Sequence, residues 1–145
     1  MSHKKIHLRV VTPDKTVVDT QVDMVGAMGS EGAFTALPGH IDFLTDLKPG
    51  ILWYRHENLT RELVVSGGFI EVRPDNARVL ADSAEYAEEI DVERAALAFK
   101  KGKDLLTKAK ASGQSGEGKA EINQITASME RAAVRLKLAA KKLPR

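Results

Sequence analysis

Apolar and polar residues alternate along the first ninety positions of the chain. Ile6, Leu8 and Val10 are each separated by one polar residue, a period of two that is typical of a strand with one buried face. Clusters of glycine, proline, aspartate and asparagine lie between further short apolar segments, as in tight turns. These segments are 17–18, 22–27, 34–37, 51–54, 63–65, 69–72 and 78–81. Many short strands at this spacing predict an antiparallel β-sandwich or barrel.

The period changes to that of a helix near residue 88. We expect a first helix over about 91–110, with Asp91 as its N-cap or as an anion in its first turn. Its small and apolar residues recur at steps of three and four: Ala95, Ala98, Phe99, Gly102, Leu105, Leu106 and Ala109. The segment 111–118 is rich in glycine and serine, which predicts a flexible loop.

A second helix follows this loop. Its apolar stripe alternates steps of three and four, as in a coiled coil, through Ile122, Ile125, Met129, Ala132, Leu136, Ala139 and Leu143. So narrow a stripe suits packing against one neighbouring helix. The predicted fold is therefore an N-terminal antiparallel β-sandwich, residues 1–86, followed by a C-terminal antiparallel two-helix hairpin, residues 87–145. Because alanine buries little area, we expect the hairpin to be marginally stable and to be a moving part.

Charge divides the chain in the same place. Residues 91–145 carry 13 Lys and Arg against six Asp and Glu, whereas residues 1–90 carry nine against 14. The basic clusters 100–103 and 141–142 read better as a solvated face for a protein partner than as a nucleic-acid site, because aromatic residues for base stacking are sparse. The chain has no cysteine, which fits a reducing compartment and excludes a thiol nucleophile or thiolate metal site. We find no signal peptide, no apolar membrane span and no phosphate loop, so we expect a soluble chain that associates with membranes through partners.

Several motifs, in this order and spacing, resemble the epsilon subunit family of rotary (F-type) ATP synthases over nearly the whole chain. They are Leu8-Arg9-Val10-Val11-Thr12-Pro13, Glu31-Gly32-Ala33-Phe34, Leu37-Pro38-Gly39-His40, Phe43-Leu44-Thr45, Leu47-Lys48-Pro49-Gly50, Val65-Ser66-Gly67-Gly68-Phe69, Leu80-Ala81-Asp82-Ser83-Ala84-Glu85 and Ile90-Asp91-Val92-Glu93-Arg94-Ala95.

The resemblance implies a non-catalytic subunit of the central stalk, with no catalytic residues, no metal and no required cofactor. Its partners would be the gamma subunit, the c-ring and the catalytic alpha and beta subunits, and it would couple proton- or sodium-driven rotation to ATP synthesis. Its C-terminal hairpin would inhibit ATP hydrolysis by extending toward an acidic region of a beta subunit. The expected location is the cytoplasmic face of a bacterial inner membrane, with a plastid thylakoid second, and the chain would be peripheral there.

The resemblance places contacts with the c-ring and gamma subunit on Glu31, Phe34 and His40. The alternative from the residues themselves is that Pro38-Gly39 is an ordinary turn and His40 a satisfied surface or core residue. The sequence departs from the family at Thr35-Ala36.

Some relatives bind ATP on the folded hairpin as a regulatory ligand. The resemblance carries that site to Glu85, Ile90, Asp91, Arg94, Ala95, Arg131 and Arg135. Arg131 and Arg135 lie four residues apart and share a helix face, and guanidinium groups suit polyphosphate. The alternative is that Asp91 caps its helix and pairs with a neighbouring charge. Lys101 stands where ATP-binding relatives often have arginine.

Two other interpretations stay open. A free-standing ATP-sensing or nucleic-acid-binding module would be a stable monomer with its own ligand affinity. In a second alternative, the hairpin packs permanently on the sandwich and has no regulatory role.

Overall fold

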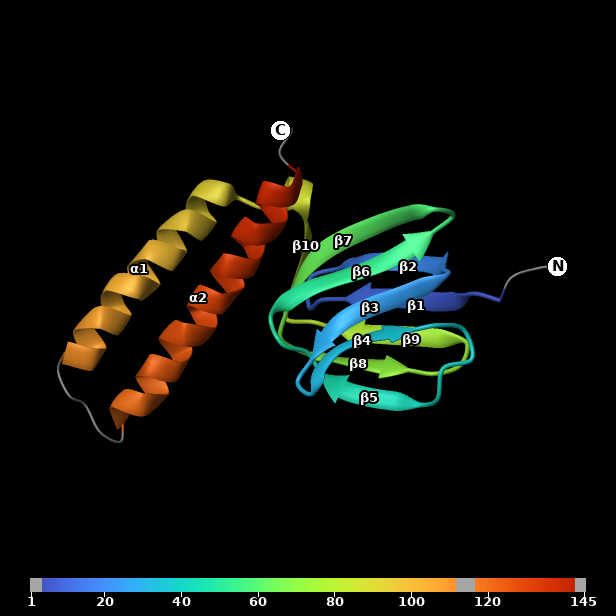
Figure 1. Cartoon of the computed structure of the whole chain (residues 1–145), viewed down its shortest axis with the longest axis horizontal. Coiled ribbons are helices and arrows are strands. Elements are labelled where there is room, and N and C mark those ends of the chain that lie inside the picture. Colours follow the sequence, from blue (N-terminus) through green and yellow to red (C-terminus); the bar gives the residue numbers. More distant parts are fainter. Residues whose placement is uncertain (1–3, 112–116, 143–145) are drawn as a thin grey trace. The chain divides into compact units, whose positions relative to one another are not determined.

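The computed structural model describes residues 4–111 and 117–142, and it divides the chain into two compact units, Met1–Ala87 and Glu88–Arg145 (Figure 1). The division lies one residue after the boundary expected from the sequence. The first unit contains the strands β1 (Ile6–Val11), β2 (Thr16–Val22), β3 (Met24–Gly29), β4 (Gly32–Ala36), β5 (Phe43–Asp46), β6 (Gly50–His56), β7 (Leu59–Ser66), β8 (Phe69–Val72), β9 (Asn76–Leu80) and β10 (Ser83–Tyr86). A 3₁₀ turn (Ala87–Glu89) leads to α1 (Val92–Ala111) and α2 (Glu117–Lys142).

The ten strands form the β-sandwich that the sequence predicts. One sheet has the order β2-β1-β9-β8-β5 and the other β10-β7-β6-β3-β4. Figure 1 shows the two sheets stacked face to face, and side chains such as Leu8, Leu63 and Ile70 fill the space between them without exposure to solvent. Strand pairs are antiparallel except β1 with β9, which are parallel neighbours. The alternation of β1 explains the arrangement, because Ile6, Leu8 and Val10 all point inward.

Two strands were not predicted, and one boundary was wrong. β5 has no buried residue and β10 is four residues long, so neither carries the apolar run that marks a strand in the sequence. The expected strand 22–27 is divided at Asp23: Val22 ends β2 in one sheet, and Met24 begins β3 in the other. Apolar residues on both sides of Asp23 concealed the point where the chain changes sheet.

A close contact fixes the only tryptophan of the chain. Trp53 on β6 lies against Gly26 on β3, its neighbour in the ladder. A Cβ atom at position 26 would come within 2.3 Å of the indole ring, so the ring occupies the space that a larger residue would need.

The second unit is an antiparallel helical hairpin in Figure 1, as predicted. The helices approach closely at Gly102 of α1, where a Cβ atom would lie 2.4 Å from Cγ of Met129 on α2. Ala95 and Gly102 are buried on α1, and Ala132 is buried on α2. Small residues at these positions let the helix axes come together.

The hairpin adds detail to the expectation. Of the neighbours Leu105 and Leu106, Leu105 is 40% exposed and Leu106 is half-buried. Leu138 is fully buried, although it lies outside the apolar stripe predicted for α2. Both helices extend into the expected loop 111–118, whose remaining residues 112–116, like Leu143 of the predicted stripe, lie outside the described residues.

Candidate functional site

Three large apolar side chains are exposed where the sandwich connects its two sheets through the segment 37–42. Leu37 is 52%, Ile41 77% and Leu44 65% exposed. Leu37 and Ile41 lie in the connection itself, and Leu44 follows on β5, the edge strand of its sheet. An edge strand next to exposed apolar side chains is a surface that a partner protein can cover. We refer to these three residues as the apolar rim.

Sequence reasoning did not select the apolar rim. The sequence does contain a sign of it. Positions 37, 41 and 44 are apolar within a turn-rich segment, whereas loops that face solvent are usually polar.

Two of the three predicted contact residues lie beside the apolar rim. The rings of Phe34 and His40 both pack edge-on against Phe43, with centroid distances of 5.1 and 6.1 Å. His40 Nδ1 donates a hydrogen bond to the Ile41 carbonyl oxygen at 2.7 Å. His40 is therefore half-buried and oriented by its neighbours.

The third predicted residue, Glu31, lies elsewhere. It is exposed in the turn between β3 and β4, close to the Asp46 end of β5, where Ser30 N–H donates to the Asp46 carbonyl oxygen at 3.0 Å. His40 follows the other end of β4. β4 has five residues and is roughly 16 Å long, at about 3.3 Å per residue. The structure therefore brings Phe34 and His40 together at Phe43 and places Glu31 at the opposite end of β4 from His40.

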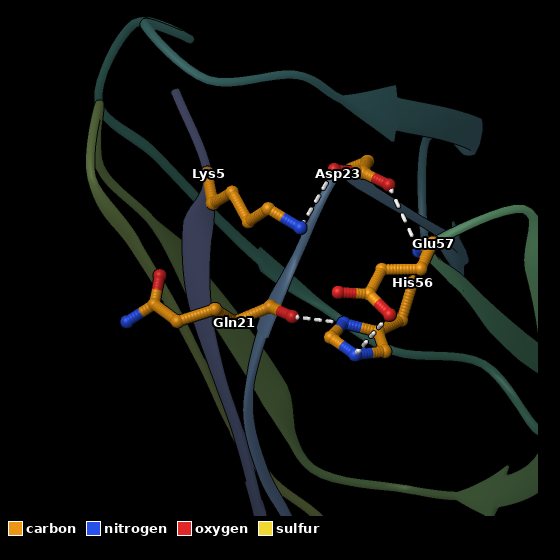
Figure 2. A network of polar contacts seen from close by, with 5 residues as sticks. All are labelled: Lys5, Gln21, Asp23, His56 and Glu57. Atoms are coloured by element: carbon orange, nitrogen blue, oxygen red, sulfur yellow. Dashed lines mark hydrogen bonds and ion pairs between the residues drawn. The ribbon is translucent and has the colours of Figure 1, made fainter. Parts of the chain in front are cut away.

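A polar network holds the point where the chain passes from one sheet to the other (Figure 2). The Asp23 carboxylate lies 3.4 Å from Lys5 Nζ and accepts the Glu57 backbone N–H at 3.2 Å. His56 Nδ1 donates to the Gln21 carbonyl oxygen at 2.7 Å. These contacts tie the β1–β2 pair to the β6–β7 turn, so the network joins the two sheets at their rim.

The same contacts determine the ionisation of Asp23. Partial burial raises the pKa of Asp23, but the hydrogen bonds from Lys5 and from the Glu57 N–H, with the charges of Lys5 and His56, outweigh burial and lower the pKa below its ordinary value. Asp23 therefore contributes to stability in its ionised form.

Three of the residues predicted to bind ATP have structural roles at the start of α1. Asp91 Oδ1 accepts the Arg94 backbone N–H at 3.1 Å, and the Asp91 carbonyl oxygen accepts the Ala95 N–H at 3.0 Å. Asp91 is thus the N-cap of α1, as the alternative interpretation held. Ile90 and Ala95 are buried, so their side chains support the start of the helix and do not present groups to a ligand.

The three arginines predicted to meet ATP lie on both helices of the hairpin. Arg94 is exposed on α1, while Arg131 and Arg135 are half-buried on α2. Gly102 of α1 lies beside Met129 of α2, which gives a common level for the two antiparallel helices. At a rise of 1.5 Å per residue, the level of Arg135 is then about 3 Å along the axis from that of Arg94, and the level of Arg131 is about 9 Å from it. Glu85 belongs to the sandwich unit, on β10 opposite Val64 of β7. Within the second unit, Arg94, Arg131 and Arg135 thus lie within about 9 Å of one another along the hairpin axis.

Two further properties concern metals and membranes. Within residues 4–111 and 117–142, no three His, Asp or Glu side chains gather in a way that could hold a metal ion. None of the helices in the described part of the chain is both long enough and apolar enough to cross a bilayer.

Comparison with known proteins gives the family. Residues 5–87, which comprise the sandwich, match the family model described as ATP synthase, Delta/Epsilon chain, beta-sandwich domain. The ATP synthase epsilon chain of Nitratidesulfovibrio vulgaris (strain DP4) is 44% identical over 126 residues, which cover 87% of this chain and 94% of that protein. The chain belongs to the ATP synthase epsilon chain family. The epsilon chain of Syntrophobacter fumaroxidans is 42% identical over 138 residues, which cover 95% of this chain and 98% of that one, so family membership extends through the hairpin.

Solved structures agree with this assignment. A chain in the OSCP/F1/c-ring structure of the Euglena gracilis mitochondrial ATP synthase superposes with a TM-score of 0.69 at 27% identity, covering 90% of this chain and 78% of that one. A chain in the central stalk/c-ring structure of the Tetrahymena thermophila enzyme gives a TM-score of 0.56 at 16% identity, covering 92% and 99%, and shares the fold.

Proposed function

We propose that this epsilon-family chain is a non-catalytic rotor subunit of the central stalk of a proton- or sodium-translocating ATP synthase. The observation that carries the proposal is the apolar rim. Leu37, Ile41 and Leu44 expose large apolar side chains beside an edge strand, and a protein that worked alone would gain by covering them. A subunit that couples rotation to ATP synthesis has to be held by such contacts.

The partners we propose are the gamma subunit and the c-ring for the sandwich, and the catalytic alpha and beta subunits for the hairpin. The apolar rim, with Phe34 and His40 packed beside it, is the part of the sandwich that we assign to the c-ring or gamma subunit. Glu31 lies at the opposite end of β4 from His40, beside the Asp46 end of β5. Through these partners the chain would be peripheral at the cytoplasmic face of a bacterial inner membrane.

The hairpin is proposed to inhibit ATP hydrolysis when it extends. Two observations support this role. Residues 91–145 carry 13 Lys and Arg against six Asp and Glu, and Lys100, Lys101 and Lys103 are exposed on α1, which suits an acidic partner surface. The contact between α1 and α2 relies on small residues such as Ala95, Gly102 and Ala132, which bury little apolar area.

ATP is proposed as a regulatory ligand that favours the folded hairpin. Arg94, Arg131 and Arg135 would meet its phosphates, and a ligand that binds the folded form more tightly shifts the population toward that form. Asp91 would act there by capping α1 and so placing Arg94, since its carboxylate already accepts the Arg94 N–H.

The deciding experiment reconstitutes an epsilon-depleted ATP synthase from a related bacterium with two forms of the chain. One is full length, and the other ends at Ala87, where the sandwich unit ends. We expect both forms to bind and the full-length form alone to suppress ATP hydrolysis. If neither form binds, the free-standing ATP-sensing or nucleic-acid-binding alternative has to be reopened. If both bind and hydrolysis is equal, the hairpin has no inhibitory role.

A point variant tests the apolar rim itself. Ile41→Glu places a charge where we expect burial, and losing the burial of such a side chain costs about 1.5–3 kcal/mol, or roughly a 10- to 150-fold weaker affinity for the enzyme. Leu59→Glu makes the same change in the sandwich outside the rim, at a β7 side chain that is 68% exposed, and should bind like the wild type. Equal binding by Ile41→Glu and the wild type would remove the rim from the interface.

A further inference from the structure

The outer face of the sheet β2-β1-β9-β8-β5 carries a basic hollow of about 370 Å³. His7, Arg9, Arg73, Asn76 and Arg78 line it together with Glu71. All six come from β1, β8, β9 or the turn between β8 and β9, so the hollow lies wholly within the sandwich unit.

Strand register sets two arginines side by side across this hollow. Arg9 on β1 and Arg78 on β9 are direct partners in the parallel ladder, where neighbouring strands lie about 4.8 Å apart. Both side chains are exposed, because Leu8, Val10 and Val79 beside them point into the core. Like charges directly opposite each other destabilise a sheet, so this pairing has a cost that a bound anion would offset.

The carboxylates around the hollow are already engaged. Asp19 on β2 pairs with His7 and lies 3.7 Å from Arg9 Nε, and these contacts, led by the hydrogen bond from His7, lower the pKa of Asp19. Glu71 accepts a hydrogen bond from Arg73 Nε at 2.9 Å, and Asp75 beside the hollow accepts one from Asn76 Nδ2 at 2.7 Å.

Arg78 differs from Arg9 and Arg73, which each lie close to a carboxylate. In the part of the chain that the structure describes, no hydrogen bond or ion pair engages the Arg78 side chain. The Arg78 guanidinium group thus lies at the centre of the row Asp19–Arg9–Arg78–Glu71 with its donors unused. Of the residues that line the hollow, Arg9, Arg73 and Arg78 face the single carboxylate of Glu71.

We propose that this hollow is a binding site for a small phosphate-bearing anion. A phosphate group offers several acceptor oxygens to donors that converge from different strands, and guanidinium forks match its geometry. A carboxylate offers two oxygens and would leave more of these donors unused. The anion is either free orthophosphate or the phosphate end of a nucleotide. Because exposed ion pairs are individually weak, we expect dissociation constants in the millimolar range. The site is separate from Arg94, Arg131 and Arg135 of the hairpin, and it does not depend on the stalk assignment.

The test is a titration of the full-length, isotope-labelled chain followed by two-dimensional NMR at constant ionic strength, with chloride as the reference salt. Separate samples receive orthophosphate and metal-free ATP. We expect saturable shifts at Arg9, Asn76 and Arg78 with orthophosphate. If ATP moves the same signals, nucleotides share the site; if ATP moves hairpin signals alone, free phosphate is the ligand.

Matched variants decide whether Arg78 carries the binding. Arg78→Gln should raise the dissociation constant about tenfold, equivalent to about 1.4 kcal/mol. Arg55→Gln, the same change at an exposed arginine of β6 in the other sheet, should leave it unchanged. The spectra of both variants also report whether the fold is intact. Shifts that grow linearly without saturation, or an equal loss in both variants, would overturn the proposal.

Discussion

Replacing Gly102 with alanine should open the helical hairpin, although alanine is the better helix former. In an exposed helix the change gains about 0.8–1.0 kcal/mol. Here the new Cβ would lie 2.4 Å from Cγ and 3.2 Å from Sδ of Met129, so the methionine has to move or the helices have to separate. Overpacking of this kind costs about 1–3 kcal/mol. The sum is a destabilisation of about 1 kcal/mol.

A second substitution reverses the sign. In a Met129→Ala background the obstructing atoms are gone, and Gly102→Ala should then stabilise the hairpin by about 0.9 kcal/mol, its helix-propensity gain. Native-state amide hydrogen exchange in α1 and α2 measures both effects as local opening free energies. A change of 1 kcal/mol alters exchange about fivefold. The double-mutant cycle removes the cost of Met129→Ala itself and leaves the coupling between the two positions.

The result that refutes this reasoning is slower exchange in Gly102→Ala with Met129 intact. That outcome would mean that helix propensity acts alone and that the close approach of α1 and α2 at this position is absent in solution. Equal effects of Gly102→Ala in the two backgrounds would lead to the same conclusion.

Three further predictions concern the cap, the sandwich and acid stability. Asp91→Ala removes the acceptor of the Arg94 N–H and should destabilise the first turn of α1 by about 1 kcal/mol, seen as faster amide exchange there, whereas Asp91→Ser keeps an acceptor and should change little. Gly26→Ala would place a Cβ atom 2.3 Å from the Trp53 ring and should lower the free energy of unfolding of the sandwich by about 1–3 kcal/mol, with a change in the fluorescence of this single tryptophan; an unchanged spectrum and melting temperature would contradict the contact. The pKa of Asp23 is lowered in the folded state, so its contribution to stability is present above the unfolded pKa of about 3.9 and is lost as pH falls through the folded pKa. Denaturant unfolding between about pH 5 and 2 should therefore depend less on pH in Asp23→Asn, and identical slopes would exclude this role.

The sequence alone determined the two units and the type of each. A period of two in residues such as Ile6, Leu8 and Val10, and a period near 3.6 from Asp91 onward, are local signals, because they depend on how successive side chains project from a strand or a helix. The cap at Asp91 was readable for the same reason, since its hydrogen bond reaches three residues along the chain. Family motifs, spread in order over both units, indicated the epsilon family before any coordinates.

Tertiary structure decided which distant residues meet. β5 became recognisable as a strand through its pairing with β8, because none of its four residues is fully buried. Strand direction separated Glu31 from His40, although nine positions in a turn-rich segment suggested one surface.

Tertiary structure also decided which charged side chains lie side by side and where the two helices approach closely. The parallel pairing of β1 with β9 put Arg9 beside Arg78, 69 positions along the chain, and helix packing placed Met129 over Gly102. Each of these outcomes depends on register and on close packing between elements, and no local pattern encodes the partner. The sequence therefore determined the elements, and long-range pairing determined the surfaces through which we expect them to act.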